Sequence, residues 1–241
     1  ANILLVAAID IAGMAVAFPI GIGLALVIGV IANFVATPVG DPLYLFLGVG
    51  FVTVAIILDA LSYKRLPSQD VNTTAKGITI SILAGVLMGF FYRFVAASMS
   101  ENFIQLTPGK MGPYAAVVVF SIGILISNFV WNTIFMKKPV SGKPVAYQRY
   151  FNEGSLKLHS IGILGGIIWS LGMSFSIIAS GAAGFAISYG LGQGATLIAA
   201  LWGVFIWKEF QEAPEGTNKL LALMFIAYLI GLAMIIIARI V

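Results

Sequence analysis

Cysteine is absent from the 241 residues, and His159 is the single histidine. Disulfide bonds, thiolate metal sites and cysteine nucleophiles are therefore excluded, and one histidine cannot build a multi-histidine metal centre. Charge is scarce as well: 9% of the residues are charged, against about 25% in soluble domains. Because 60% of the residues are hydrophobic and the mean hydropathy is +1.05, the sequence predicts an all-α polytopic membrane protein in the lipid bilayer.

The net charge of +4 does not indicate a nucleic-acid partner, because the basic residues sit in short loops beside apolar spans. Ten of the 13 Lys and Arg residues fall in loops 64–76, 137–157 and 208–219. Basic loops stay on the cytoplasmic side. We therefore expect a multi-pass protein of the cell inner (plasma) membrane whose C-terminus lies on the periplasmic or extracellular side. No cofactor and no metal site is expected.

Apolar segments long enough to cross a hydrocarbon core of roughly 30 Å recur along the chain. An apolar piece at 1–10 is too short to span alone and looks like half a helix. Seven full spans are expected at 13–36, 43–63, 77–97, 113–136, 158–180, 183–207 and 220–238.

The span 183–207 carries a glycine cluster and one uncharged glutamine near its centre. Tyr189, Gln193 and Thr196 are spaced by four and three residues, so they share one helix face. We predict that this face binds substrate; the alternative is that Gln193 only joins two helices by a hydrogen bond. The glycines Gly190, Gly192 and Gly194 are predicted to serve hinge or packing roles, with a GxxxG step between the first and the last.

An internal repeat appears when the chain is shifted by 171 residues. AGMAVAFPIGIGLALVIGVIANF, from Ala12, then aligns with AGFAISYGLGQGATLIAALWGVF, from Ala183, with seven of 23 positions identical. The loop charges give the two copies opposite directions, and inverted repeats are common in secondary transporters. In the first copy Pro19, Gly21 and Gly23 are the hinge or packing candidates, Pro19 because it removes a backbone hydrogen bond.

The repeat also predicts the domain organisation. Residues 1–65 would be the remainder of the first repeat, 66–76 a cytoplasmic linker and 77–241 the complete second repeat. Since the second copy begins two and a half helices earlier than the first, we expect roughly 95 further residues upstream in a parent protein with five plus five helices.

Three stretches resemble a known family: AGMAVAFPIGIGLALVIG, AGVLMGFFYRF and GFAISYGLGQGATLIAALWGVFIWKEF. They are similar to the bacterial sugar-porter branch of the drug/metabolite transporter superfamily, to its glucose/ribose porters and L-rhamnose–proton symporter, and more distantly to the plant ureide permeases. The resemblance covers essentially the whole chain. It implies a ten-helix inverted-repeat fold and uptake of a small polar solute, most simply a sugar, by alternating access.

A sugar requires hydrogen-bond partners for its hydroxyls and an apolar surface for its C–H face. Such groups lie at similar depth in the spans 113–136 and 158–180. The further substrate-binding candidates are Asn128, Trp131, Asn132, Trp169 and Ser170. Belt positions at the membrane surface are the alternative for both tryptophans.

Ionisable residues near the spans supply the remaining candidates. Arg93 follows Tyr92 deep in its span, and both are candidate substrate-binding residues, although a snorkelling Arg93 is the alternative. Protons are a candidate coupling ion, and Asp10 is the predicted coupling residue. Asp59 is expected to pair with Lys64 or Arg65, and His159 is expected to be hydrated.

Other functions fit the sequence less well. An intramembrane enzyme would need a Ser–His or carboxylate pair at one depth, and His159 lies about 16–22 Å along its helix from the serines at 170 and 174. The protein is therefore not expected to be an enzyme. Within transport there are two alternatives: the protein exports drugs or amphipathic metabolites, or it takes up solutes as ureide permeases do. A structural partner subunit is disfavoured by the inverted repeat.

Overall fold

The structure is a computed structural model that describes residues 1–66 and 75–241, except for the side chains at 14–16, 18 and 19. Every regular element of these residues is helical. The order is α1 (Asn2–Ala12), α2 (Met14–Ala36), α3 (Pro42–Tyr63), α4 (Ala75–Ser98), α5 (Pro113–Lys137), α6 (Tyr147–Glu153), α7 (Leu156–Ala183), α8 (Phe185–Gly192), α9 (Gly194–Leu201), the π-helical turn η1 (Trp202–Ile206) and α10 (Thr217–Ile240).

Six helical segments of the described residues are long and apolar enough to cross a membrane. They are α3, α4, α5, α7, the joined segment Phe185–Ile206 and α10. These six confirm six of the expected spans and the class of an all-α polytopic membrane protein. The seventh expected span is α2, which has 23 residues. The short apolar helix α1, with 11 residues, occupies the place of the expected half helix.

Glycine interrupts the chain at two equivalent places. α1 ends at Ala12 and α2 begins at Met14, while α7 ends at Ala183 and α8 begins at Phe185. The residues between them, Gly13 and Gly184, have φ/ψ of 76°/159° and 84°/154°. Side chains other than glycine essentially never adopt this conformation. The two breaks lie at the 171-residue spacing of the predicted repeat and share one backbone geometry.

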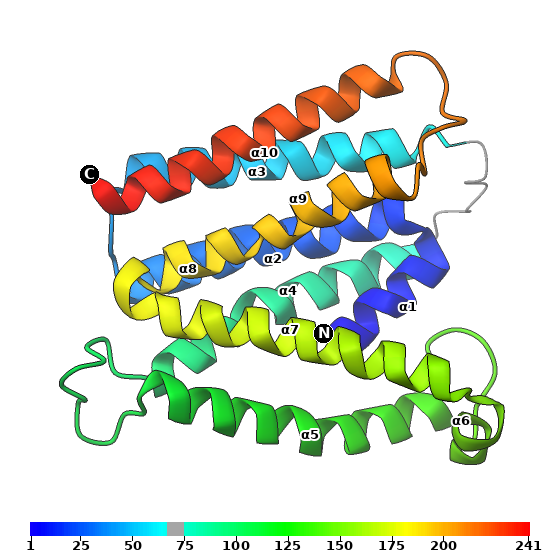
Figure 1. Cartoon of the computed structure of the whole chain (residues 1–241), viewed down its shortest axis with the longest axis horizontal. Coiled ribbons are helices and arrows are strands. Elements are labelled where there is room, and N and C mark those ends of the chain that lie inside the picture. The colour runs from blue at the N-terminus through cyan, green and yellow to red at the C-terminus, as the bar shows by residue number, and fades with distance from the viewer. Residues whose placement is uncertain (67–74) are drawn as a thin grey trace. The chain divides into compact units, whose positions relative to one another are not determined.

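The chain divides into two compact units. The first unit contains Ala1–Ala97 with Ala182–Val241, and the second contains Ser98–Gly181. Within the first unit α10 packs along α3, and α8 packs on α2, as the red, cyan, yellow and blue helices of Figure 1 show. These pairs join residues from the two expected repeats, and the repeat boundaries at 65 and 77 stay a prediction. Most of the expected linker, 67–74, lies outside the described residues.

Facing glycines allow a close helix crossing between α3 and α10 in the first unit. A Cβ at Gly48 of α3 would stand 2.8 Å from the carbonyl oxygen of Gly231 of α10, and a Cβ at Gly231 would stand 2.8 Å from that of Gly48. Both distances are shorter than real Cβ contacts. The α3–α10 pair therefore packs backbone against backbone, as small residues allow in membranes.

The glycines expected at helix contacts behave differently. A Cβ at Gly21 would meet the end of the Leu5 side chain at 2.7 Å, and one at Gly23 would meet nothing within 4 Å. At Gly190 and Gly194 the nearest atoms would stand at 3.4 and 3.5 Å, which is ordinary contact. Gly190 and Gly194 are therefore not required for close packing in this conformation, and the hinge or packing role of Gly192 stays a prediction. The proposed hinge at Pro19 lies outside the described side chains.

The second unit consists of α5, α6 and α7 with their connecting loops. Its loop after α4 is tied by backbone bonds between Ser100 and Met111 and by an Asn102 side chain that accepts from the Ile104 and Gln105 N–H groups. Within this unit, α5 and α7 expose nearly all of their apolar side chains. Such faces suit contact with lipid or with another helix.

Candidate functional site

The expected continuous helix at 183–207 is broken at Gln193. α8 ends at Gly192 and α9 begins at Gly194. The Gln193 N–H donates to the Gly190 carbonyl (3.2 Å), and its own carbonyl accepts from the Thr196 N–H (3.0 Å). Both bonds span three residues instead of four, as in a 3₁₀ turn. The glycines on either side explain the break, because glycine favours the helix less than other residues do.

The break places the polar side chain of Gln193 at an irregular turn inside an apolar span. Gln193 and Thr196 are half-buried, and the π-helical turn η1 follows within the same span. Irregular turns inside helices are frequent at functional sites, and transporters often form substrate sites from interrupted helices. The substrate-binding role of Gln193 and Thr196 stays a prediction with this local geometry behind it.

The contacts of Tyr189 show that its side chain packs between helices. Its side chain is buried, and its hydroxyl donates toward the carbonyls of Ala25 on α2 (3.1 Å) and Met88 on α4 (3.2 Å). Its ring centroid lies 5.3 Å from that of Tyr92, and its ring fills the space beside Gly29. Tyr189 thus joins α8 to α2 and α4. Its predicted contact with substrate stays a prediction.

Tyr92 and Arg93 lie in different environments although they are neighbours on α4. Tyr92 is 1% exposed, whereas Arg93 is half-buried. Adjacent helical residues point in different directions, and the predicted substrate contacts of Tyr92 and Arg93 stay predictions. Tyr92 belongs to the aromatic cluster with Tyr189 and Phe91.

The other predicted binding residues lie in the second unit. The Asn132 side chain donates from Nδ2 to Oδ1 of Asn128 (2.6 Å) one turn away on α5. Trp131 is 53% exposed and Trp169 is 45% exposed. The backbone carbonyl of Ser170 accepts a hydrogen bond from the side-chain hydroxyl of Ser174 (2.7 Å), and the predicted contact of the Ser170 side chain with substrate stays a prediction. Among these residues of the second unit, the two asparagines are thus a pair that the structure brings together.

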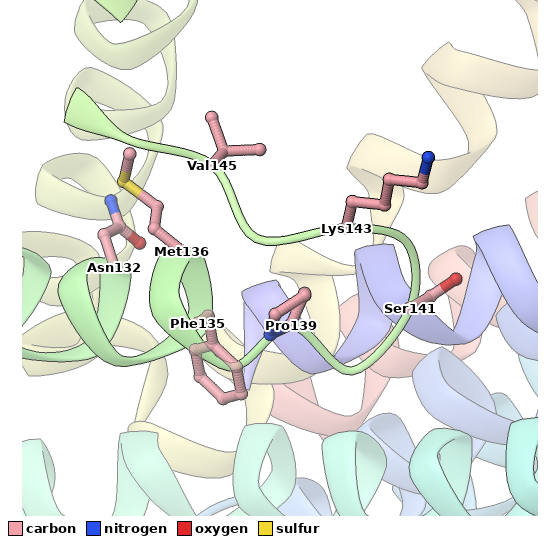
Figure 2. A pocket seen from close by; sticks show the side chains of 7 residues that line it. All are labelled: Asn132, Phe135, Met136, Pro139, Ser141, Lys143 and Val145. Carbon is pink, nitrogen blue, oxygen red and sulfur yellow. The ribbon is translucent and has the colours of Figure 1, made fainter. Parts of the chain in front are cut away.

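A pocket of about 330 Å³ lies where α5 meets the following loop (Figure 2). It is lined by Asn132, Phe135, Met136, Pro139, Ser141, Lys143 and Val145. In Figure 2, Asn132, Phe135 and Met136 come from the helix and the others from the loop. Asn132 is the predicted binding residue on this pocket. Its place at the hydrophilic end of α5 differs from the mid-membrane site expected for a transporter.

A larger pocket of about 780 Å³ lies in the same unit, among α6, α7 and their connection. Arg149 and Glu153 form an ion pair on it, and Glu153 raises the pKa of Arg149 by hydrogen bonding and charge. The ring of His159 lies 4.6 Å from that of Tyr150. Both ion-pair partners are exposed, so this pocket belongs to the hydrated loop region.

Polar residues of α3 and the segment after η1 form a group that the sequence did not reveal. The Tyr63 hydroxyl donates to Oε2 of Glu209 (2.6 Å), and Asp59 interacts electrostatically with the same carboxylate. Across residues 1–66 and 75–241 no ion pair of Asp59 with Lys64 or Arg65 occurs. The expected pairing of Asp59 is therefore wrong: its side chain is half-buried and has no ion-pair partner among the described residues.

The spacing of Asp59 and Tyr63, one helical turn apart, was the available signal for this group. Glu209 could not be added from sequence, since it follows the span by a turn whose direction depends on the fold. Asn33 of α2 was also missed: it is 1% exposed, and its Oδ1 has no hydrogen-bond partner. The predicted coupling residue Asp10 is exposed near the end of α1, and its role stays a prediction.

Comparison with known proteins gives one match. Residues 61–238 match the family model described as Ureide permease. Neither the curated proteins nor the solved structures contain a significant match to the chain. The family match covers α4 to α9 completely and most of α10. It includes the broken helix and the segment with Glu209.

Proposed function

Because the chain belongs to the ureide permease family, we propose that it carries a small polar solute across the membrane by alternating access, with a ureide as the first candidate. The multiple membrane-spanning helices and the family agree with a membrane transporter. The sugar-porter resemblance receives no support from the match. A sugar stays the second candidate, because the mid-span Asn, Gln and Thr side chains can bond hydroxyls as well as amide groups.

One observation carries the proposal at the level of residues: the interruption of an apolar span at Gln193. An amide side chain has two donors and an acceptor oxygen, so it can match the N–H and C=O groups of a ureide. The flanking 3₁₀ bonds leave the local backbone outside the regular helix pattern. Interrupted helices at mid-membrane depth hold substrate in several transporter folds.

The inverted repeat supports the alternating-access part of the proposal. The matched glycine breaks at Gly13 and Gly184 have the same backbone geometry, and α2 packs on its repeat counterpart α8. In transporters with inverted repeats, the two copies exchange conformations around a central site. We propose an orientation with loops 137–157 and 208–219 in the cytoplasm, and protons as the coupling ion.

Replacing Gln193 with alanine should weaken binding of the transported solute about 10-fold, since one hydrogen bond to a neutral group is worth about 1 kcal/mol or somewhat more in a desolvated site. The binding constant is measured from the shift in melting temperature with allantoin, a ureide, and separately with D-ribose and L-rhamnose. Gln211→Ala, in an exposed loop, is the control and should bind as the wild type does. An unchanged binding constant in Gln193→Ala would assign Gln193 to helix packing.

A further inference from the structure

A basic segment joins α5 to α7 within the second unit. Between residues 137 and 157 it carries five basic residues and a single acid, Glu153, so its net charge is +4. The basic residues are Lys137, Lys138, Lys143, Arg149 and Lys157. Clusters of Lys and Arg next to a membrane span attract anionic lipids. The segment therefore has the charge that an anionic lipid surface requires.

The short helix α6 of this segment has an aromatic face and a charged face. Tyr150 and Phe151 follow Tyr147 by three and four residues, so the three rings share one face. They are 57%, 71% and 44% exposed, respectively. Arg149 and Glu153 form an ion pair on another face of the helix. Aromatic side chains beside charged ones are typical of helices that lie in the membrane interface.

Side-chain contacts hold α6 at the ends of two spans. The hydroxyls of Tyr147 and Thr133 of α5 share a hydrogen bond of 2.5 Å. The ring centroid of Tyr150 lies 4.6 Å from that of His159 of α7. In Figure 1, α6 lies where α5 ends and α7 begins. The aromatic residues of α6 thus attach it to both neighbouring helices of its unit.

These contacts leave the pocket of about 780 Å³ among α6, the loop before it and the start of α7. Small-molecule sites have volumes in this range. Its lining is part polar and part apolar. The polar side chains are those of Arg149, Tyr150, Glu153 and His159, and the apolar ones are those of Met136, Val145, Leu158 and Ile163. A molecule with a polar headgroup and apolar chains matches this lining.

The pocket lies at the depth where the two spans reach the membrane surface. Met136 belongs to the last turn of α5 and Leu158 to the first turn of α7, and both helices are long and apolar enough to cross a membrane. The lining continues along α7 through Gly162 and Ile163. Most apolar side chains of α7 are exposed. Acyl chains that leave the pocket would therefore meet an apolar helix surface.

The neighbouring pocket of about 330 Å³ brings a second cation to the same place. It shares Met136 and Val145 with the larger pocket, and Lys143 lines it. The Val145 N–H donates to the Met136 carbonyl (2.9 Å), which holds the loop against the end of α5. Figure 2 shows the Lys143 side chain projecting from this loop. Lys143 is exposed.

The ion pair leaves Arg149 able to bind an anion. Its recorded bond to Glu153 uses Nε, while a guanidinium carries further N–H donors that match phosphate oxygens. Glu153 compensates the charge of Arg149 inside the pocket. The excess positive charge of the segment therefore comes from its lysines, and it favours an anion over a headgroup that carries an ammonium group.

We propose that the larger pocket binds the headgroup of an anionic phospholipid, with the lipid phosphate on Arg149 and the acyl chains along α7. Lys143 adds positive charge beside the shared residues Met136 and Val145. Tyr150 and His159 close the pocket on the side of α7. This lipid site requires no transport activity, so it stands independently of the proposed function.

Native mass spectrometry of the purified protein measures the dissociation constant for phosphatidylglycerol, with zwitterionic phosphatidylethanolamine as the comparison. Phosphatidylglycerol should bind at least about 10-fold more tightly, because two basic side chains lie near its phosphate. Inorganic phosphate should not displace it, since phosphate lacks the acyl chains. Equal binding of the two lipids, or displacement by phosphate, overturns the proposal. A dimer without bound lipid would assign this surface to a second copy of the chain.

The residue that holds the phosphate is tested with Arg149→Gln. Loss of a charge-assisted hydrogen bond should weaken phosphatidylglycerol binding about 30-fold. Lys157→Gln removes the same charge from an exposed residue of the same segment that does not line the pocket, and it should weaken binding no more than about 5-fold. Equal losses in the two variants would assign the lipid to the general charge of the segment and overturn the site.

A pair of uncharged variants tests the pocket itself. A Cβ at Gly162 or at Gly166 would meet nothing within 4 Å, so both positions accept a larger side chain. Gly162 lines the pocket, whereas Gly166, one turn further along α7, does not. Gly162→Phe should fill the pocket and weaken phosphatidylglycerol binding at least 10-fold, about as a lost anchor would. Gly166→Phe should bind as the wild type does, and unchanged binding in Gly162→Phe overturns the proposal.

Discussion

The substitution Gly48→Val is expected to lower the free energy of unfolding by about 3 kcal/mol and the melting temperature by roughly 10 °C. A Cβ at Gly48 would stand 2.7 Å from Cγ1 and 3.0 Å from the backbone nitrogen of Ile235, in addition to the Gly231 carbonyl. Backbone atoms cannot move aside as a flexible side chain can, so α3 and α10 must separate. The melting temperature in detergent measures this cost.

Gly50 supplies the matched control on the same helix. It is exposed, and a Cβ there would meet nothing within 4 Å. Gly50→Val should change the free energy of unfolding by no more than about 0.5 kcal/mol. Equal melting temperatures for the two variants would contradict the backbone-to-backbone contact between α3 and α10.

Removing the Tyr189 side chain is expected to cost about 3–4 kcal/mol, because the substitution leaves a cavity and removes a buried hydroxyl that bonds two helices. Tyr189→Ala should therefore lower the melting temperature by roughly 10 °C. Tyr189→Phe keeps the ring against α2 and α4 and loses the hydroxyl contacts to Ala25 and Met88, so about 1 kcal/mol should be lost.

The same variants separate packing from substrate binding. Tyr114, which is 72% exposed, supplies the control, and Tyr114→Ala should leave the melting temperature nearly unchanged. If Tyr189 contacts substrate, Tyr189→Phe weakens allantoin or ribose binding in addition to this loss of stability. A loss of stability with unchanged binding assigns Tyr189 to helix packing.

The positions of the helices were predictable from sequence, because an apolar segment must be long enough to cross the hydrocarbon core of the membrane. The expected span 43–63 is α3, which begins at Pro42, and the expected span 113–136 is α5, which begins at Pro113. The break at Gln193 was not predicted, since hydropathy averages over a whole span and does not register one turn of changed hydrogen bonding. The glycines around it were recognised, but as packing surfaces.

The contacts of individual side chains were harder to predict than their depth in the membrane. Asn128 and Asn132 were placed on one stretch of α5, and they bond each other. Glu209 was assigned to a loop, while the π-helical turn and the left-handed Lys208 return it to Tyr63. Asp59 was expected to pair with Lys64 or Arg65, yet it forms no ion pair with either residue. Contacts between segments so far apart in the chain depend on how the helices pack.

The short motifs suggested sugar porters and, more distantly, ureide permeases, and the family match supports the ureide permeases. The glycine-rich stretches at Ala12 and Gly184 carry little information about the family, because small residues serve any close helix crossing. They suggested sugar porters first, whereas the match over residues 61–238 is to ureide permeases. The residues that select a substrate are few and cannot be recognised by glycine spacing.

Solute uptake by the protein in sealed liposomes tests the central claim most directly. Labelled allantoin, D-ribose and a lipophilic cation are supplied outside, with and without a pH gradient that is acidic outside. The account predicts saturable uptake of allantoin or of the sugar, stimulated by the gradient and reduced in Gln193→Ala. Uptake confined to the lipophilic cation, or no uptake of any of them, would contradict it.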